Sequence, residues 1–93
     1  MQINYFAAAR AAAGTPTEEI EASQVVARHD EELTLDALTA FLAQRHTGRT
    51  PSGMSFAKVL EQCSFLIDGV ASQADATVPS GARVDVLPPF AGG

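Results

Sequence analysis

The residues of this chain that are best placed for chemistry are its last two, Gly92 and Gly93. Neither glycine has a Cβ, so the end of the chain is thin enough to enter a narrow channel. The carboxylate of Gly93 is the reactive group there. A bare carboxylate is a poor electrophile, but joining it to AMP makes a mixed anhydride that a sulfur or amine nucleophile can attack. We therefore predict that Gly93 is the site of adenylation and of later transfer chemistry.

A short strand and two prolines precede these glycines. Residues 82–87 alternate as a strand, and Pro88 and Pro89 stop sheet pairing because proline has no N–H and a fixed φ. We expect a domain over residues 1–87 and an extended, flexible tail over residues 88–93. Glycines at a chain end can also simply fray without a function. Their position directly after a strand and a Pro-Pro pair favours a functional tail.

The end of the chain, from Ser80 to Gly93, resembles the small sulfur-carrier subunit of molybdopterin synthase (the MoaD type), one of the ubiquitin-like sulfur carriers. The resemblance rests on the strand from Arg83 to Leu87 and the Pro-Pro-Phe-Ala-Gly-Gly run that follows it. It extends over most of the chain, including the opening strand and the alanine-rich turn after it. Its specific part is the tail, so the remaining residues are interpreted on their own.

What this resemblance implies is a sulfur-transfer route with several partners. An E1-like enzyme would use ATP to adenylate Gly93, and a sulfur donor would convert it to a thiocarboxylate. The tail would then enter the large subunit of molybdopterin synthase, where the sulfur helps to build the dithiolene of molybdopterin from a cyclic pterin precursor. The residues implied to line that tunnel are Pro88, Pro89, Phe90, Ala91 and Gly92. Phe90 is bulkier than the residue expected at its position.

Two other functions are compatible with the same tail. The first keeps the sulfur chemistry but serves another pathway, such as thiamine, cysteine or tRNA thiolation. The Pro-Pro pair before the last four residues favours the molybdopterin pathway over these. The second is a ubiquitin-like modifier or an interaction module, in which Gly93 forms isopeptide bonds or has no chemical role.

Length and composition limit the function classes further. A chain of 93 residues with 46% hydrophobic content predicts one folded domain with a single modest core. One cysteine cannot form an internal disulfide, which suits a reducing, cytoplasmic setting. The net charge of −5 and a pI near 4.7 argue against nucleic acid and favour a basic protein partner. The sequence also shows no signal peptide and no apolar run of the roughly 18–20 residues that a membrane helix needs.

Hydrophobic periodicity and turn signals predict a mixed α+β fold. We expect strands over residues 1–6, 17–22, 63–67, 70–72 and 82–87. We expect helices over residues 7–13, 34–45 and 54–62, with connectors at 23–32 and 49–53. Thr34 is the expected N-cap of the main helix and Gly48 its expected end, while the Glu residues of the second strand should face water. A mixed sheet of about five strands packed on one main helix is the ubiquitin-like β-grasp fold.

The sequence offers little for catalysis within the chain itself. His29 and His46 are expected at the surface, and Cys63 as a buried, inert thiol. The acidic run 30–32 is expected to be a solvated segment before the main helix rather than a metal site. The sequence has neither zinc-ligand spacing nor a glycine-rich loop with a lysine that would hold nucleotide phosphates. We therefore expect no cofactor on this chain, and ATP to be used by a separate activating enzyme; the chain would not be catalytic alone.

A second functional feature is a pair of apolar residues on the outward side of the sheet. By strand phase, Phe6 and Leu87 face away from the core, and the β-grasp fold makes their strands parallel neighbours. Ala71 joins them if the hairpin has the expected phase. An apolar cluster beside the tail predicts a docking patch for a partner. The alternative is that the alanine-rich helix or a loop covers it.

Overall fold

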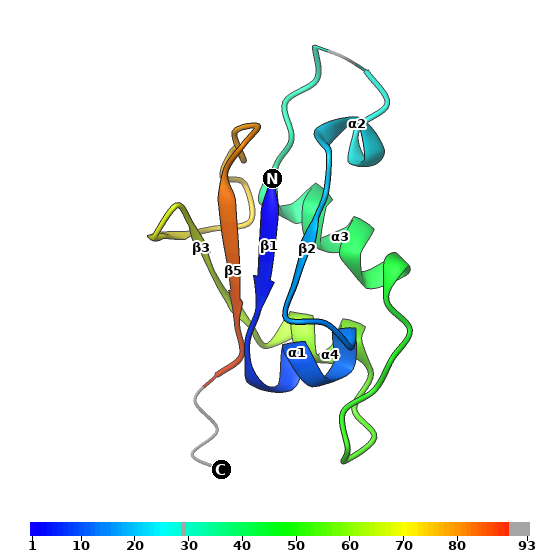
Figure 1. The fold of residues 1–93 in the computed structure, drawn as a ribbon. Coiled ribbons are helices and arrows are strands. Elements are labelled where there is room, and N and C mark those ends of the chain that lie inside the picture. Colours follow the sequence, from blue (N-terminus) through cyan, green and yellow to red (C-terminus); the bar gives the residue numbers. More distant parts are fainter. Residues whose placement is uncertain (29, 90–93) are drawn as a thin grey trace.

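The computed structural model of the chain describes residues 1–28 and 30–89. Five strands form one sheet in the order β2-β1-β5-β3-β4. They are β1 (Gln2–Tyr5), β2 (Thr17–Glu19), β3 (Ser64–Ile67), β4 (Val70–Ser72) and β5 (Arg83–Leu87). The helices are α1 (Ala7–Ala13), α2 (Ala22–Val25), α3 (Leu35–Arg45) and α4 (Phe56–Glu61). The main helix α3 packs across one side of the sheet (Figure 1). This is the ubiquitin-like β-grasp arrangement that the sequence predicts.

The centre of the sheet is a parallel pair. β1 and β5 run side by side in the same direction, with Ile3 opposite Val84 and Tyr5 opposite Val86. All other neighbouring strands are antiparallel. Because β1 is the first strand and β5 the last, this pairing brings the two ends of the domain together.

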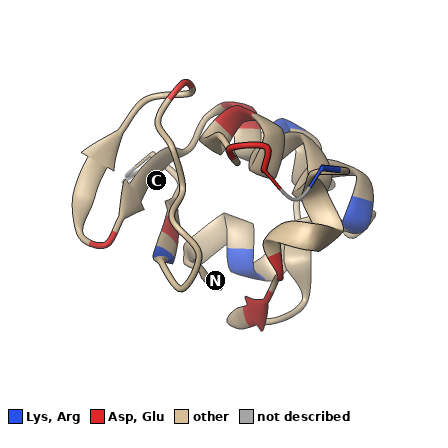
Figure 2. Cartoon of the chain, turned by 90° about the horizontal axis from the view of Figure 1, so that it is seen from above, with Lys and Arg blue, Asp and Glu red and all other residues tan. Residues whose placement is uncertain are grey.

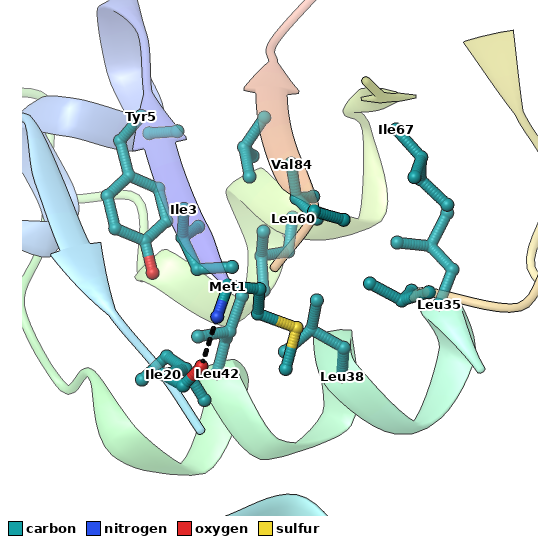
Figure 3. Packing of buried hydrophobic residues seen from close by; sticks show 14 of the residues in the cluster. Met1, Ile3, Tyr5, Ile20, Leu35, Leu38, Leu42, Leu60, Ile67 and Val84 are labelled. Carbon is teal, nitrogen blue, oxygen red and sulfur yellow. Dashed lines mark hydrogen bonds between the residues drawn. The ribbon is translucent and has the colours of Figure 1, made fainter. Parts of the chain in front are cut away.

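One hydrophobic core fills the space between the sheet and α3. Side chains of period two on the strands meet side chains of period 3.6 on the helix, as Figure 3 shows for Ile3, Val84 and Leu38. The fully buried large side chains are Ile3, Tyr5, Ile20, Leu35, Leu38, Leu42, Phe56, Val59, Val84 and Val86. Phe41, expected on the same helix stripe, is only partly buried against this core.

Several local signals act as the sequence predicts. Gly14 ends α1 in the left-handed region, with φ of 80°, and its N–H donates to the Arg10 carbonyl. The hydroxyl of Thr34 accepts a hydrogen bond from the Ala37 N–H and caps α3. Asp68 and Gly69 both have positive φ, at 49° and 83°, which is the two-residue hairpin turn expected between β3 and β4.

The structure differs from the sequence prediction mainly at the end of β2 and after α3, and the other elements begin and end within two residues of their expected bounds. Strand β2 stops at Glu19, and the short helix α2 begins at Ala22, where the end of the predicted strand and the start of the predicted connector were expected. Glu21 and Gln24 hold the start of α2 in a reciprocal capping box, whose Glu-x-x-Gln spacing is visible in the sequence.

The end of α3 also differs. The helix ends at His46 in extended backbone, not in a left-handed turn at Gly48. Gly48 is needed for another reason: a Cβ built there would lie 2.2 Å from the Ala12 carbonyl oxygen. The glycine therefore lets the loop after α3 lie directly against the end of α1.

A polar cluster centred on Glu18 links the edge strand β2 to β1 and to the end of α3. The Glu18 carboxylate accepts hydrogen bonds from the Tyr5 hydroxyl and from Arg45 Nε, each at 2.6 Å, and contacts His46 Nε2. The side chains of Glu18 and His46 are only 12% and 14% exposed. The expectations that Glu18 faces water and that His46 lies at the surface are therefore wrong. His29, the other histidine, lies outside the described residues.

Burial and hydrogen bonding act in opposite directions on the Glu18 carboxyl. Partial burial raises its pKa, but hydrogen bonds from Tyr5, His46 and Arg45 together outweigh burial and hold the pKa below its ordinary value. Burial, with the Glu18 carboxylate beside it, raises the pKa of the Tyr5 phenol so that the hydroxyl remains a donor.

The cluster predicts an acid-sensitive part of the folding free energy. Since the folded pKa of Glu18 is lowered, its contribution is present above the unfolded pKa and is lost as pH falls through the folded pKa. We expect Glu18→Gln to be less stable than the parent at about pH 7, and the difference to shrink towards about pH 3. Urea unfolding of the parent and the variant at both pH values measures this difference in the free energy of unfolding. The control is Glu32→Gln, at an exposed position. An equal difference at both pH values would contradict this account.

The core predicts a large loss of stability when Leu38 is truncated. Its side chain is fully buried between α3 and the sheet, so Leu38→Ala should lower the free energy of unfolding by about 2–5 kcal/mol. Gln44→Ala, at an exposed position of the same helix, should have little effect. A loss for Leu38→Ala no larger than that for Gln44→Ala would mean that α3 packs differently.

Candidate functional site

The tail leaves the domain where β5 ends, beside the start of α1 (Figure 1). The Phe6 N–H donates to the Val86 carbonyl at 3.3 Å, which joins the β1–α1 junction to the end of β5. Pro88 is half-buried and Pro89 is exposed, and neither belongs to a strand. The other predicted tail residues lie outside the described residues; they are Phe90, Ala91, Gly92 and Gly93. The expectation that they are extended and flexible therefore stays a prediction.

The side of the sheet away from α3 carries the other predicted site residues. Strand register places Asn4, Asp85, Leu66 and Ala71 in one row across β1, β5, β3 and β4. In the adjacent row, next to the tail, Leu87 lies opposite Ser64 and follows the Tyr5–Val86 pair, so it is beside Phe6. We call the set Phe6, Leu66, Ala71, Asp85 and Leu87 the docking face.

The exposure of the docking face agrees with its outward orientation. Phe6 is 45% exposed and Ala71 is exposed, while Leu66 and Leu87 are half-buried between neighbouring strands. The hairpin therefore has the phase that puts Ala71 on this side. Leu66 was not found from the sequence, because the apolar run 63–67 shows no alternation that would reveal which of its residues point outward.

The backbone after Phe6 explains why its ring is exposed. Phe6 is extended, but Ala7 adopts a φ of 49°, in the left-handed region that non-glycine residues seldom occupy. This single residue turns the chain from β1 into α1 within one step. The Phe6 side chain beside this turn is 45% exposed, so α1 leaves much of it uncovered.

A polar pair lies among the apolar residues of the docking face. The Asn4 amide nitrogen donates to Asp85 Oδ1 at 2.8 Å, and Gln2 donates to Asn4 Oδ1 at 2.9 Å. Asp85 points outward, as predicted, yet the residue is only 9% exposed because its neighbours enclose it. Arg83 Nε lies 3.6 Å from Asp85 Oδ2.

The rest of the described chain offers little reactive chemistry. The Cys63 thiol is half-buried, not fully buried as expected, and it donates to the Val59 carbonyl at 3.2 Å. Burial raises its pKa to about 11, so it stays protonated and a poor nucleophile near neutral pH. Over residues 1–28 and 30–89 no group of three His, Cys, Asp or Glu side chains is arranged to hold a metal ion. None of the helices in that part of the chain is long and apolar enough to cross a membrane.

The charges show no surface suited to nucleic acid in the described part of the chain. Basic residues lie on separate elements, among them Arg10 on α1, Arg45 on α3 and Lys58 on α4, and Figure 2 shows them apart from one another. Acidic residues are more numerous, 11 against 6 in the whole sequence. A phosphate backbone would meet net repulsion over most of this surface.

Comparisons with known proteins agree with the fold. The model of the ThiS family matches residues 3–93. A search of curated proteins finds no significant match. Two solved structures of small archaeal modifier protein 1 (SAMP1) from Haloferax volcanii are similar in fold. One is 19% identical over 99% of this chain and 97% of its own, with a TM-score of 0.66. The other is 18% identical over 96% and 95%, with a TM-score of 0.65.

The docking face predicts a variant that separates folding from association. Leu87→Glu should leave the chain folded, because Leu87 lies on the open side of the sheet, and should abolish stable binding to a partner by placing an unpaired charge in an apolar interface. Circular dichroism and a binding assay with the activating enzyme measure the two effects. The matched control is Val70→Glu at the 65% exposed hairpin end. Unfolding of the Leu87→Glu chain would mean that Leu87 belongs to the core.

Proposed function

The chain belongs to the ThiS family, and from this we propose that it is a sulfur carrier whose Gly93 is activated and then carries the sulfur. The observation that supports the proposal most directly is the extent of the family match, which runs from β1 through residue 93 and so includes the whole tail. The tail follows β5 without an intervening element, and the docking face lies beside its base. A partner bound to that face would receive the tail from a fixed starting point.

The chemistry at Gly93 requires a second protein. One carboxylate oxygen attacks the α-phosphorus of ATP, pyrophosphate leaves, and the glycine carbonyl becomes part of a mixed anhydride with AMP. A sulfur nucleophile then attacks this carbonyl carbon, and AMP leaves. The sequence has no glycine-rich loop with a lysine to hold the nucleotide, so an E1-like enzyme would bind the ATP. A sulfur donor is the third participant.

Within this function, the pathway that we propose is molybdenum cofactor biosynthesis in the cytoplasm. The chain would be the small subunit of molybdopterin synthase, and its thiocarboxylate would supply sulfur to the pterin precursor inside the large subunit. The support is the Pro88-Pro89 pair between β5 and the last four residues. Two prolines in series hold an extended backbone, which suits a segment that must reach into a tunnel.

A second candidate is a ubiquitin-like protein modifier. Both similar solved structures carry the name of a small archaeal modifier protein, and the shared β-grasp fold is compatible with that role. The two functions differ in what joins Gly93: sulfur in a carrier, and an amine of a target protein in a modifier. Intact mass spectrometry of the protein from its own cells separates them. A carrier gains only the mass difference between sulfur and oxygen, whereas a modifier gains a whole protein, and the same spectrum shows whether the chain ends at Gly93.

The position of the terminal carboxylate predicts the effect of deleting Gly93. Removal of one extended residue withdraws the carboxylate by about 3.5 Å, and misplacement of a reacting group by even an ångström reduces rates on the order of a hundredfold. We expect adenylation by the E1-like enzyme and thiocarboxylate formation to fall at least that far. The melting temperature should remain unchanged, because the described core is complete without residue 93.

An extension provides the matched variant. One alanine added after Gly93 converts the glycine carboxylate into an amide, so sulfur transfer should be lost without any residue of the domain being altered. Normal sulfur transfer by the chain that lacks Gly93 would disprove the sulfur-carrier function.

A further inference from the structure

We propose that Asp85 is the charged anchor of the docking face and binds an arginine of the partner protein. This rests on the proposed function, since the partner meant is the E1-like enzyme that activates Gly93. The proposal starts from a carboxylate that is almost enclosed on the side of the sheet away from α3. The Asp85 side chain is only 13% exposed, although no helix of the described chain covers that side.

The position of Asp85 within the face is central. Asn4 and Leu66 flank it on the neighbouring strands, and Leu87 follows it on the same side of β5 towards the tail. The carboxylate is therefore bordered by apolar surface in the direction of the tail and of β3. A partner that covers Phe6 and Leu87 must also cover Asp85.

The two oxygens of Asp85 are not equally engaged. Oδ1 accepts a good hydrogen bond from Asn4 at 2.8 Å, which fixes the orientation of the carboxylate. Oδ2 has only the 3.6 Å approach of Arg83 Nε, which exceeds hydrogen-bond length. The Arg83 side chain is itself 53% exposed and held by no shorter contact among the described side chains. Oδ2 is thus positioned by Asn4 and left able to accept a stronger donor.

The surrounding charge favours a cation. Asp68 lies beside Arg83 at the hairpin turn, accepting a hydrogen bond from the Arg83 N–H at 2.9 Å, and Glu19 lies opposite Gln2 on the same side of the sheet. The N-terminal ammonium lies 3.2 Å from Glu19 Oε2 and already balances that carboxylate. The two remaining carboxylates, Asp68 and Asp85, face one guanidinium, that of Arg83, so one negative charge is left for a second guanidinium to balance at Oδ2.

Arginine fits this position better than lysine. Its planar guanidinium is weakly hydrated and can donate to Oδ2 while it lies against apolar side chains such as Phe6 and Leu87. A lysine ammonium would keep more of its water and would need more space. Arginine is also among the residues enriched at protein interfaces.

The same carboxylate selects against other partners. A wholly apolar surface that docked here would exclude water from Asp85 and leave a charge without a partner, which is strongly unfavourable. Asp85 therefore adds specificity to a face whose apolar residues alone would accept many proteins. This selection is testable, because removal of the Asp85 charge should weaken the binding of the arginine-bearing partner and of no other.

The experiment compares the parent chain with Asp85→Asn and with the control Asp36→Asn. Asparagine keeps the shape and the oxygen that accepts from Asn4, so the melting temperature should not change. Binding to the purified E1-like enzyme of the source genome is measured by titration calorimetry at low and high salt. We expect Asp85→Asn to weaken binding about tenfold or more and to reduce its salt dependence, since hydrogen bonds to charged groups are the stronger ones. Asp36, exposed on α3, should tolerate the change.

The outcomes separate this inference from the proposed function. If Asp85→Asn binds as tightly as the parent while Leu87→Glu does not bind, Asp85 is not an anchor and the inference is overturned. If Asp85→Asn is destabilised, binding is compared well below both melting temperatures, and an affinity equal to that of the parent again overturns it. A different result would overturn the proposed function. In that case the enzyme binds the parent chain more tightly than Asp85→Asn, as expected, but does not adenylate Gly93.

Discussion

The parallel pairing of β1 with β5 is the constraint on which the other features depend. It joins the first and last strands of the domain, so the point where the tail leaves is fixed by hydrogen bonds to residues at the start of the chain. It also places the β1–α1 junction beside the tail, which is how Phe6 comes to lie next to Leu87. Non-local parallel pairing costs more chain entropy than a hairpin does. The core between the sheet and α3 supplies the burial that offsets this loss.

Much of the fold follows from local signals in the sequence. The alanine run ended by Gly14, the Thr34 cap and the Asp68-Gly69 turn each predict their element correctly because the physical cause lies within a few residues. Alternation in the first and last strands likewise assigns Ile3, Val84 and their partners to the core. The structure differs from the sequence prediction where one local signal is compatible with two structural roles. Gly48 looks like a helix cap but permits a close approach to Ala12.

What the sequence could not reveal depends on long-range partners. Glu18 has the type and position of a solvated edge-strand residue, and its environment changes only because Tyr5, Arg45 and His46 converge on it from β1 and from the end of α3. No pattern within β2 predicts that convergence. The candidate site shows the same division: the outward phase of Phe6 and Leu87 is readable from alternation, whereas the near-complete enclosure of Asp85 requires its neighbours on β1 and β3 to be known.

The period of two along β5 separates stability from recognition at the level of single residues. Val84 and Val86 face the core and hold the strand in place, while Asp85 and Leu87, between and after them, face the open side. Substitutions at alternate positions therefore act on different properties of the same short strand. The arrangement also explains how the domain tolerates a half-exposed apolar face: the residues on that face contribute little to the core, so they can change without loss of the fold.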